Sequence, residues 1–255
     1  MGKIISVVNQ KGGVGKTTTA VNLASGIGLL GKKVLLVDAD PQGNTTSGYG
    51  INKKSVEFSS YNILNGTAKV NQTIIKTQFK NVDVIPSSMD LAAAEIELIE
   101  MENRQEKLKM ALAAVRENYD YIFIDCPPSL GLITINALCA SDTFLVPIQC
   151  EYYAMEGLSQ LMSTVRQIKR LYNETLELEG VILTMYDGRL NLTQQVVGEI
   201  KKFFDKKLFS TPVPRGVRLS EAPSFGLPIQ YYDKRSKGAL AYDALAKEFI
   251  KRNKR

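Results

Sequence analysis

A glycine-rich loop near the N-terminus has the residue types of a phosphate-binding site. It follows an apolar run, precedes a helical pattern, and consists of Lys11, Gly12, Gly13, Val14, Gly15, Lys16, Thr17 and Thr18. Glycines let the backbone turn tightly and gather several N–H groups, and the following helix offers its positive N-terminal end. Lys16 can meet the phosphates and Thr17 can ligate Mg²⁺. A ligand-free glycine-rich turn is the alternative, which this density of glycine, lysine and threonine disfavours.

The loop departs from the general phosphate-loop pattern, Gly-x4-Gly-Lys-Ser/Thr, at one position. Gln10 stands where the first glycine is expected, and an additional lysine, Lys11, directly precedes the glycine pair. The loop therefore carries two lysines where the general pattern has one.

Three aspartates follow apolar runs that are typical of buried strands. Asp125 ends the run Tyr121–Asp125, and Asp38 and Asp40 follow residues 34–37. Ligands of open α/β sheets lie at the carboxyl ends of the strands, so Asp125 is predicted to be a Walker B carboxylate that acts on Mg²⁺ directly or through water. A helix cap is the alternative for Asp125. Asp38 and Asp40 leave the same side of an extended backbone and could address one metal, water and phosphate site; a turn-forming Asp-x-Asp-Pro is the alternative.

The elements that must position these residues alternate between strands and helices. Strands are predicted at residues 4–8, 34–37, 82–86, 121–125, 143–148, 180–184 and 209–213. Helices are predicted at residues 17–30, 61–64, 90–101, 105–118, 133–139, 155–172, 194–207 and 238–252. Such alternation requires right-handed crossovers and gives an α/β fold with a mainly parallel twisted sheet and helices on both faces. With the glycine-rich loop after the first strand, the expected type is a P-loop NTPase. One domain over residues 1–255 is expected, without an N-terminal helix-turn-helix domain.

Composition limits the function classes. The 32 Lys and Arg against 26 Asp and Glu give a net charge of +6, which favours polyanionic partners, although an ordinary soluble surface is an equal alternative. The absence of His excludes histidine bases and histidine metal ligands. Cys126, Cys139 and Cys150 form neither a disulfide framework nor a Cys-x-x-Cys site, which fits a reducing cytoplasm. No apolar run approaches the ~20 residues that span a bilayer.

The variant loop, Lys-Gly-Gly-x-Gly-Lys-Thr, resembles the deviant Walker A motif of the ParA/MinD superfamily. The resemblance to the short chromosomal ParA/Soj chromosome-partitioning ATPases covers nearly the whole chain. It rests on residues 11–18, 37–48, 124–138, 149–153 and 218–224. This likeness implies a slow ATPase that uses ATP and Mg²⁺ and forms a homodimer around two ATP molecules. In the ATP state such a dimer binds double-stranded DNA without sequence preference, and the amino-terminal segment of ParB stimulates it.

The family's cycle segregates chromosomes or plasmids on the nucleoid and in some members regulates replication initiation. By resemblance, Lys11 reaches the partner subunit's nucleotide, Asp38 helps to hold the magnesium shell and Asp40 orients the attacking water. The segment from Asp38 to Thr46 and residues 126–131 would be the two switches. A second lysine has little obvious use in a monomer, whereas across a two-fold interface it can couple ATP to dimer formation.

Two arginines match family positions for DNA binding, Arg189 and Arg218. Non-specific binding requires surface cations that attract phosphates, although each cation alone could be an ordinary solvated charge. The plausible companions are Lys201, Lys202, Arg215, Lys234, Arg235 and Lys237. Pro214 resembles a residue of the family's adenine-edge loop, but Gly216 replaces the usual Asn. Thr184 and Asp187 are further base-side candidates.

Other classes of protein also carry this glycine-rich loop and are alternative interpretations of the sequence. A MinD-like membrane-cycling ATPase would end in a basic amphipathic segment with exposed apolar residues, whereas residues 246–255 are basic without an apolar anchor. An ordinary packed helix, without stable membrane association, is therefore expected. A metal-cluster carrier would need interfacial cysteines at suitable positions. A nucleotide-binding regulator that does not hydrolyse ATP is a further alternative, because the sequence shows residues suited to hydrolysis but not the rate of hydrolysis.

Overall fold

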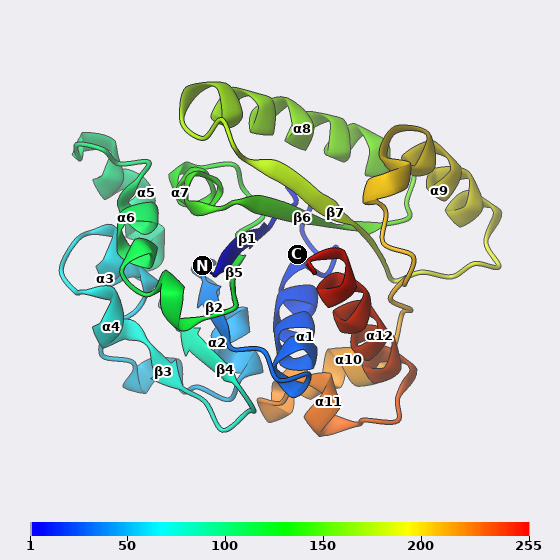
Figure 1. Cartoon of the computed structure of the whole chain (residues 1–255), viewed down its shortest axis with the longest axis horizontal. Coiled ribbons are helices and arrows are strands. Elements are labelled where there is room, and N and C mark those ends of the chain that lie inside the picture. The colour runs from blue at the N-terminus through cyan, green and yellow to red at the C-terminus, as the bar shows by residue number, and fades with distance from the viewer. Residues whose placement is uncertain (1, 255) are drawn as a thin grey trace.

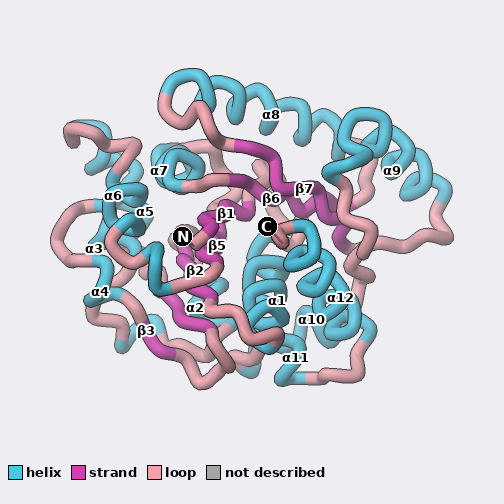
Figure 2. Tube along the Cα trace, viewed as in Figure 1, coloured by secondary structure: helices cyan, strands magenta, loops and turns pink. Residues whose placement is uncertain are grey.

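The computed structural model describes residues 2–254 and shows a seven-stranded sheet with helices on both faces (Figure 1, Figure 2). The strands are β1 Lys3–Val7, β2 Val34–Asp38, β3 Ile75–Lys76, β4 Val82–Ile85, β5 Tyr121–Asp125, β6 Thr143–Gln149 and β7 Glu177–Thr184. The α-helices are α1 Lys16–Leu29, α2 Asn44–Gly48, α3 Ser60–Leu64, α4 Val70–Thr73, α5 Leu91–Glu97, α6 Lys107–Ala113, α7 Leu132–Ala140, α8 Ala154–Leu171, α9 Asn191–Phe204, α10 Val217–Glu221, α11 Ile229–Tyr232 and α12 Lys237–Arg252.

The strand order is β3-β4-β2-β5-β1-β6-β7, and all pairs are parallel except the short edge pair β3–β4. Strands β2 and β5 are buried along their whole length, which is why they read as continuous apolar runs. The predicted α/β fold with a mainly parallel sheet is confirmed.

Two apolar layers enclose the sheet. On one face α1 and α12 pack together, with Leu23 and Phe249 fully buried in the same cluster. On the other face, helices α5 to α9 contribute buried residues such as Leu161 and Ile200 (Figure 1). Because Phe249 is buried near the end of α12, the last helix is packed as expected. No helix within residues 2–254 is long and apolar enough to cross a membrane.

The strand register brings the candidate site residues together at the carboxyl ends of the central strands. Val7 at the end of β1 and Asp38 at the end of β2 both align with Asp125 at the end of β5. The glycine-rich loop and the loops after β2 and β5 therefore start at the same level, side by side.

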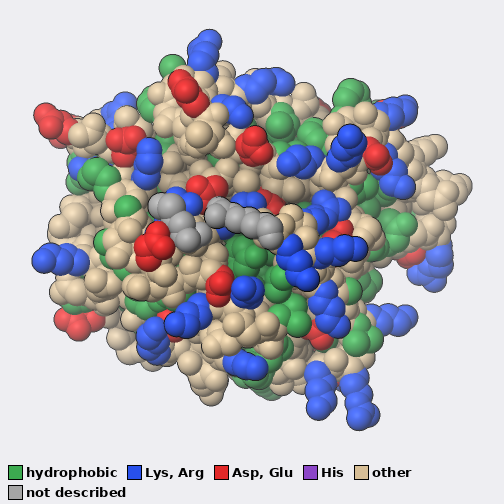
Figure 3. All heavy atoms as spheres, in the orientation of Figure 1, with side chains coloured by type: hydrophobic (Ala, Val, Ile, Leu, Met, Phe, Trp, Pro, Cys, Tyr) green, Lys and Arg blue, Asp and Glu red, His purple; other side chains and the backbone are tan. Residues whose placement is uncertain are grey.

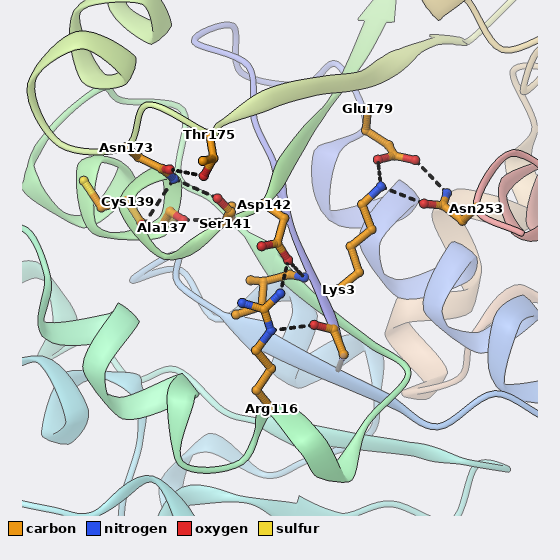
Figure 4. Close-up of polar contacts among 12 residues, drawn as sticks. Lys3, Arg116, Ala137, Cys139, Ser141, Asp142, Asn173, Thr175, Glu179 and Asn253 are labelled. Carbon is orange, nitrogen blue, oxygen red and sulfur yellow. Dashed lines mark hydrogen bonds and ion pairs between the residues drawn. The ribbon is translucent and has the colours of Figure 1, made fainter. Parts of the chain in front are cut away.

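Polar contacts fasten the opposite edge of the sheet (Figure 4). The Lys3 ammonium binds Glu179 of β7 and donates to Asn253 Oδ1 over 2.6 Å, while Asn253 Nδ2 donates to Glu179 Oε1 over 2.7 Å. Nearby, the Arg116 guanidinium pairs with Asp142 at 2.6 Å. The end of α12 is thus tied to β1 and β7.

The predicted strand at residues 209–213 is wrong. This segment runs beside β7, with Phe209 N–H donating to Val181 O over 2.9 Å, but the isolated bridges form only at its flanks, Leu208 and Pro214. Proline at 212 lacks an N–H group, and the N–H groups of Ser210 and Thr211 donate to the Glu248 carboxylate of α12 instead of a strand.

Two predicted helices are shorter than expected. The helix expected at 90–101 ends at Glu97 and continues as a 3₁₀ turn, Leu98–Glu100, and the helix expected at 105–118 ends at Ala113. Between them Asn103 adopts a positive φ of 51°, a left-handed conformation that breaks helical continuity.

Candidate nucleotide site

The glycine-rich loop joins β1 to α1 and needs glycine at two positions. Gly13 has a φ of 74° and Gly15 a φ of 86°, values in the left-handed region that other residues rarely adopt. Thr19 N–H donates to Gly15 O over 2.9 Å, so α1 starts directly at the loop. The loop backbone and the first turn of α1 consequently face the same space, as a phosphate cradle requires.

Lys16 lies at the base of this loop, and its side chain is buried. Its residue is only 7% exposed, and its ammonium donates to Lys11 O over 3.1 Å. Burial lowers the pKa of Lys16, and the negative charge of Asp125 opposes this effect. A buried ammonium that donates a hydrogen bond to a neutral carbonyl is well suited to binding an anion.

Asp125 has the properties expected of a metal-binding carboxylate. Its Oδ2 accepts a hydrogen bond from Thr45 Oγ1 over 2.8 Å, whereas its buried Oδ1 has no hydrogen-bond partner among the described residues. Burial, reinforced by the nearby charge of Asp38, raises the pKa of Asp125 to about 7. A divalent cation would satisfy the unpaired oxygen and restore the charged form.

The carboxylates alone do not form a closed metal site. Within residues 2–254, no group of three or more His, Cys, Asp or Glu side chains is arranged to hold a metal ion. A Mg²⁺ ion held by Thr17 and Asp125 would therefore take its other ligands from phosphate and water, which is how Mg²⁺ is usually bound with nucleotides.

Asp38 is engaged within its own segment. Its Oδ2 accepts hydrogen bonds from both the N–H and the hydroxyl group of Thr46, at 2.8 and 2.6 Å, and its Oδ1 accepts from Asp40 N–H at 3.2 Å. Burial raises the pKa of Asp38 to about 6, and the hydrogen bonds from Thr46 oppose the rise. Asp38 thus holds the segment up to Thr46, the predicted first switch.

Asp40 lies at the start of the turn that follows β2. It is 8% exposed, and its Oδ1 accepts a hydrogen bond from Gln42 N–H over 2.9 Å. Its charge reaches both Lys16 and Asp125, because it contributes to the pKa shift of each. Asp40 therefore lies within electrostatic reach of the same centre.

A cleft of about 430 Å³ adjoins the loop and contains two of the predicted base-side residues, Thr184 and Pro214. Thr17, Thr18, Thr184 and Pro214 line it together with Gly15. The hydroxyl group of Thr184 donates to Val14 O over 2.7 Å, which joins the end of β7 to the loop. Asp187, the other base-side candidate, does not line the cleft.

Several residues at this site have no individual role in the sequence prediction, although two of them, Asn44 and Thr45, belong to the predicted first switch. Asn44, Ser47, Met185 and Tyr242 also line the cleft, and Thr45 binds Asp125. Asn44 and Thr45 stand directly after the predicted aspartate turn, which was the available signal for them. No local pattern indicated Met185 or Tyr242, since distant parts of the chain bring them there.

Lys11 forms an ion pair with Glu151, the second residue after β6. Both side chains are about two-fifths exposed, at 42% and 43%. The Lys11 ammonium binds this carboxylate, and the Lys11 carbonyl oxygen accepts a hydrogen bond from the Lys16 ammonium. In a single chain, the second lysine of the loop is thus occupied by an acid of the same chain.

Arg189 and Arg218 both lie on exposed segments, and neither lines the cleft. Arg189 is paired with Asp187 through two hydrogen bonds, at 2.9 and 2.7 Å, and Arg218 with Glu221 at 2.9 Å. Tyr186 N–H donates to Val213 O over 3.0 Å and so joins the two segments that carry these arginines. Figure 3 shows many Lys and Arg side chains on the side of α9 and α12.

Comparison with known proteins places the chain among ATPases of one family. A family model described as an AAA domain matches residues 2–178. The sporulation initiation inhibitor protein Soj of Bacillus subtilis is 59% identical over 97% of this chain and 98% of its own length. The chromosome partitioning protein ParA of Myxococcus xanthus is 49% identical over 99% of this chain and 89% of its own length.

A solved structure agrees with this likeness. Cobyrinic acid a,c-diamide synthase from Mycobacterium smegmatis, with bound ATP analogue and magnesium, superposes with a TM-score of 0.86 at 32% identity. The match covers 98% of this chain and 95% of that one. Because the chain has the variant loop and the aligned carboxylates, and is 59% and 49% identical to Soj and ParA over nearly its whole length, it belongs to the ParA/Soj family of chromosome-partitioning ATPases.

Proposed function

We propose that this chain binds ATP and Mg²⁺ in the cleft and at the loop, and hydrolyses ATP slowly. The observation that carries the proposal is a buried Lys16 ammonium within electrostatic reach of Asp125, beside a glycine cradle. Asp125 Oδ1 has no hydrogen-bond partner in the described part of the chain. The solved relative with bound ATP analogue and magnesium supports the choice of cofactors. Bound Mg²⁺ supplies neutralisation of phosphate charge.

The chain's own groups have separate tasks in this proposal. Backbone N–H groups of residues 12–18 and the Lys16 ammonium stabilise the charge that spreads over the phosphoryl oxygens. Thr17 and Asp125 would hold the metal, Asp38 fixes the loop that leads to Thr46, and Asp40 would orient the attacking water. Pro214 and Thr184 border the space for the base.

Lys11 is assigned to dimer formation. Its ion pair with Glu151 is exposed, and an exposed pair contributes only about 0–1 kcal/mol, so a more favourable partner can replace it. The phosphates of a nucleotide in a second subunit are such a partner, because they carry more charge than one carboxylate. ATP would then bring two chains together around two nucleotides.

In the ATP state the dimer is proposed to bind double-stranded DNA without sequence preference. Arg189 and Arg218 are 89% and 59% exposed, so both guanidinium groups are accessible to phosphates. Dimer formation doubles the number of such groups on one surface, which favours a long polyanion. We place the protein on the nucleoid, where stimulation by ParB would release it and drive segregation of a chromosome or plasmid. A second proposed role is regulation of replication initiation.

One set of measurements tests this proposal. ATP hydrolysis and DNA binding are measured with ATP, with ADP and with a slowly hydrolysed analogue, with and without the cognate ParB. Binding to DNA should need ATP and should weaken steeply with salt. DNA binding that is equal in ADP and ATP, or insensitive to salt, would contradict it.

A further inference from the structure

Helix α5 has apolar side chains on both of its faces. Leu91 and Leu98 point into the core and are fully buried. Away from the core, Met89 just before the helix, Ile96 within it and Ile99 in the 3₁₀ turn that follows are 65%, 74% and 55% exposed. A helix that needs only one apolar stripe to pack carries a second stripe here, and contiguous exposed apolar side chains mark interaction sites. We call this stripe the α5 outer face; it consists of Met89, Ala92, Ala93, Ile96 and Ile99.

The α5 outer face has acidic surroundings. Residues 89–106 contain six Asp and Glu residues and a single Arg, within a chain of net charge +6. Glu100 and Glu102 are exposed, and neither has an ion-pair partner among the described residues. Arg104, the one cation of the segment, donates to the carbonyl of Ile99. Negative charge beside apolar side chains is complementary to a basic amphipathic segment.

The same helix is fastened to the loop that follows Asp125. Glu95 of α5 accepts hydrogen bonds from Leu132 N–H at 2.7 Å and Ile133 N–H at 3.3 Å, at the start of α7. The Glu95 carboxylate lies so close to Gly131 that a Cβ there would be 2.4 Å from it. Displacement of α5 therefore acts on the end of the predicted second switch, residues 126–131.

We propose that the α5 outer face is the docking surface for a basic amphipathic segment of the partner that stimulates ATP hydrolysis. This inference rests on the proposed function, because it assumes partner stimulation. Lysine or arginine side chains of the segment meet Glu100 and Glu102, while its apolar side chains cover Ile96 and Ile99. Glu95 carries the effect to the start of α7, and is a positioning residue.

Charge reversal on the full chain tests the docking surface. The double variant Glu100→Lys and Glu102→Lys is compared with a matched control, Glu174→Lys and Glu177→Lys, because all four glutamates are exposed and without ion pairs in the described part of the chain. The probe is a peptide of the first ~20 residues of the cognate ParB, a length sufficient for several helical turns. ATP hydrolysis is measured against peptide concentration, and thermal melting checks folding.

The double variant should need about tenfold more peptide for half-maximal stimulation, since two favourable charge contacts become repulsive, and the control should change less than about twofold. Equal stimulation of both variants would overturn the docking surface and leave the proposed function intact. Absence of stimulation in the unaltered chain would instead overturn the proposed function. If Ile96→Ser lowers the ATP-dependent dimer fraction, the face contacts a second copy of this chain, which also overturns the inference.

Glu95→Gln separates docking from coupling. A glutamine keeps the size of the side chain but provides one neutral oxygen instead of a carboxylate for the two N–H groups of α7. The peptide should bind this variant with unchanged affinity, measured by fluorescence anisotropy, yet raise its ATP hydrolysis less than in the unaltered chain. Full stimulation of Glu95→Gln would show that the effect does not pass through α7.

Discussion

Asp125→Asn is expected to make the nucleotide-free protein more stable while abolishing its ATP hydrolysis. The Asp125 carboxyl group is fully buried, aligned in the sheet with Asp38, and has one oxygen without a hydrogen-bond partner in the described part of the chain. Without a metal, its negative charge is therefore unfavourable. An asparagine of nearly the same shape removes that charge and can still accept the hydrogen bond from Thr45.

The magnitude follows from the pKa of Asp125. Burial raises this pKa from 3.8 to about 7, and each pH unit corresponds to about 1.4 kcal/mol, so ionisation costs at most about 4 kcal/mol. A weaker hydrogen bond from Thr45 offsets about 1 kcal/mol, which leaves an expected gain of about 1–3 kcal/mol. The native state keeps its proton up to about pH 7, whereas the unfolded chain loses it near pH 4. The gain should therefore be absent at acidic pH and develop as the pH rises through this range.

Urea denaturation without nucleotide or metal measures the difference, at about pH 4 and about pH 8, with the exposed Asp205→Asn as control. The free energy of unfolding should rise only for Asp125→Asn and only at the higher pH. Destabilisation at pH 8, or an equal gain at both pH values, would refute the reasoning. Loss of ATP hydrolysis in the same variant would show that the unaltered protein keeps the destabilising Asp125 carboxylate because ATP hydrolysis requires it.

Three further outcomes are expected. Lys11→Ala should lose ATP-dependent dimer formation, measured by sedimentation. Glu151→Gln should strengthen dimer formation severalfold, because a surface ion pair of about 0–1 kcal/mol no longer competes for Lys11. An unchanged dimer fraction in either variant counts against a role of Lys11 in dimer formation. Gly28→Ala should lower the free energy of unfolding by about 1–3 kcal/mol in urea titrations, since the new Cβ would lie 2.4 Å from a backbone oxygen; undiminished stability would contradict this packing. Arg189→Ala and Arg218→Ala should each reduce the slope of DNA affinity against salt by about one, and an unaltered slope would remove that arginine from the interface.

The sheet could be predicted from sequence because its strands are short, apolar and buried on both faces. The same runs deliver Asp38 and Asp125 to one edge, so the approximate position of the site followed from the chain order alone. Residues 209–213 were misread for a physical reason. Their β-like composition was visible, but the competing acceptor, Glu248, lies about 37 residues further along the chain.

Long-range partners also explain what the sequence could not reveal at the site. The Lys11–Glu151 ion pair joins residues 140 positions apart, and nothing near either residue indicates the other. An extended backbone places the Asp38 and Asp40 side chains on the same side and does not distinguish them. In the structure Asp38 accepts a hydrogen bond from the Thr46 hydroxyl group, whereas Asp40 accepts one from Gln42 N–H. Local spacing predicts which residues share an edge, whereas individual hydrogen bonds depend on the assembled fold.

The last helix bears on how experiments at the C-terminus should be read. Tyr242 of α12 lines the cleft and forms a hydrogen bond of 3.2 Å with Thr19, and Glu248 fixes the segment that leads to Pro214. A truncation or a bulky tag at this end would therefore disturb the wall of the nucleotide cleft. Loss of function in such a variant is no evidence for a membrane anchor in α12, unless nucleotide affinity is shown to be intact.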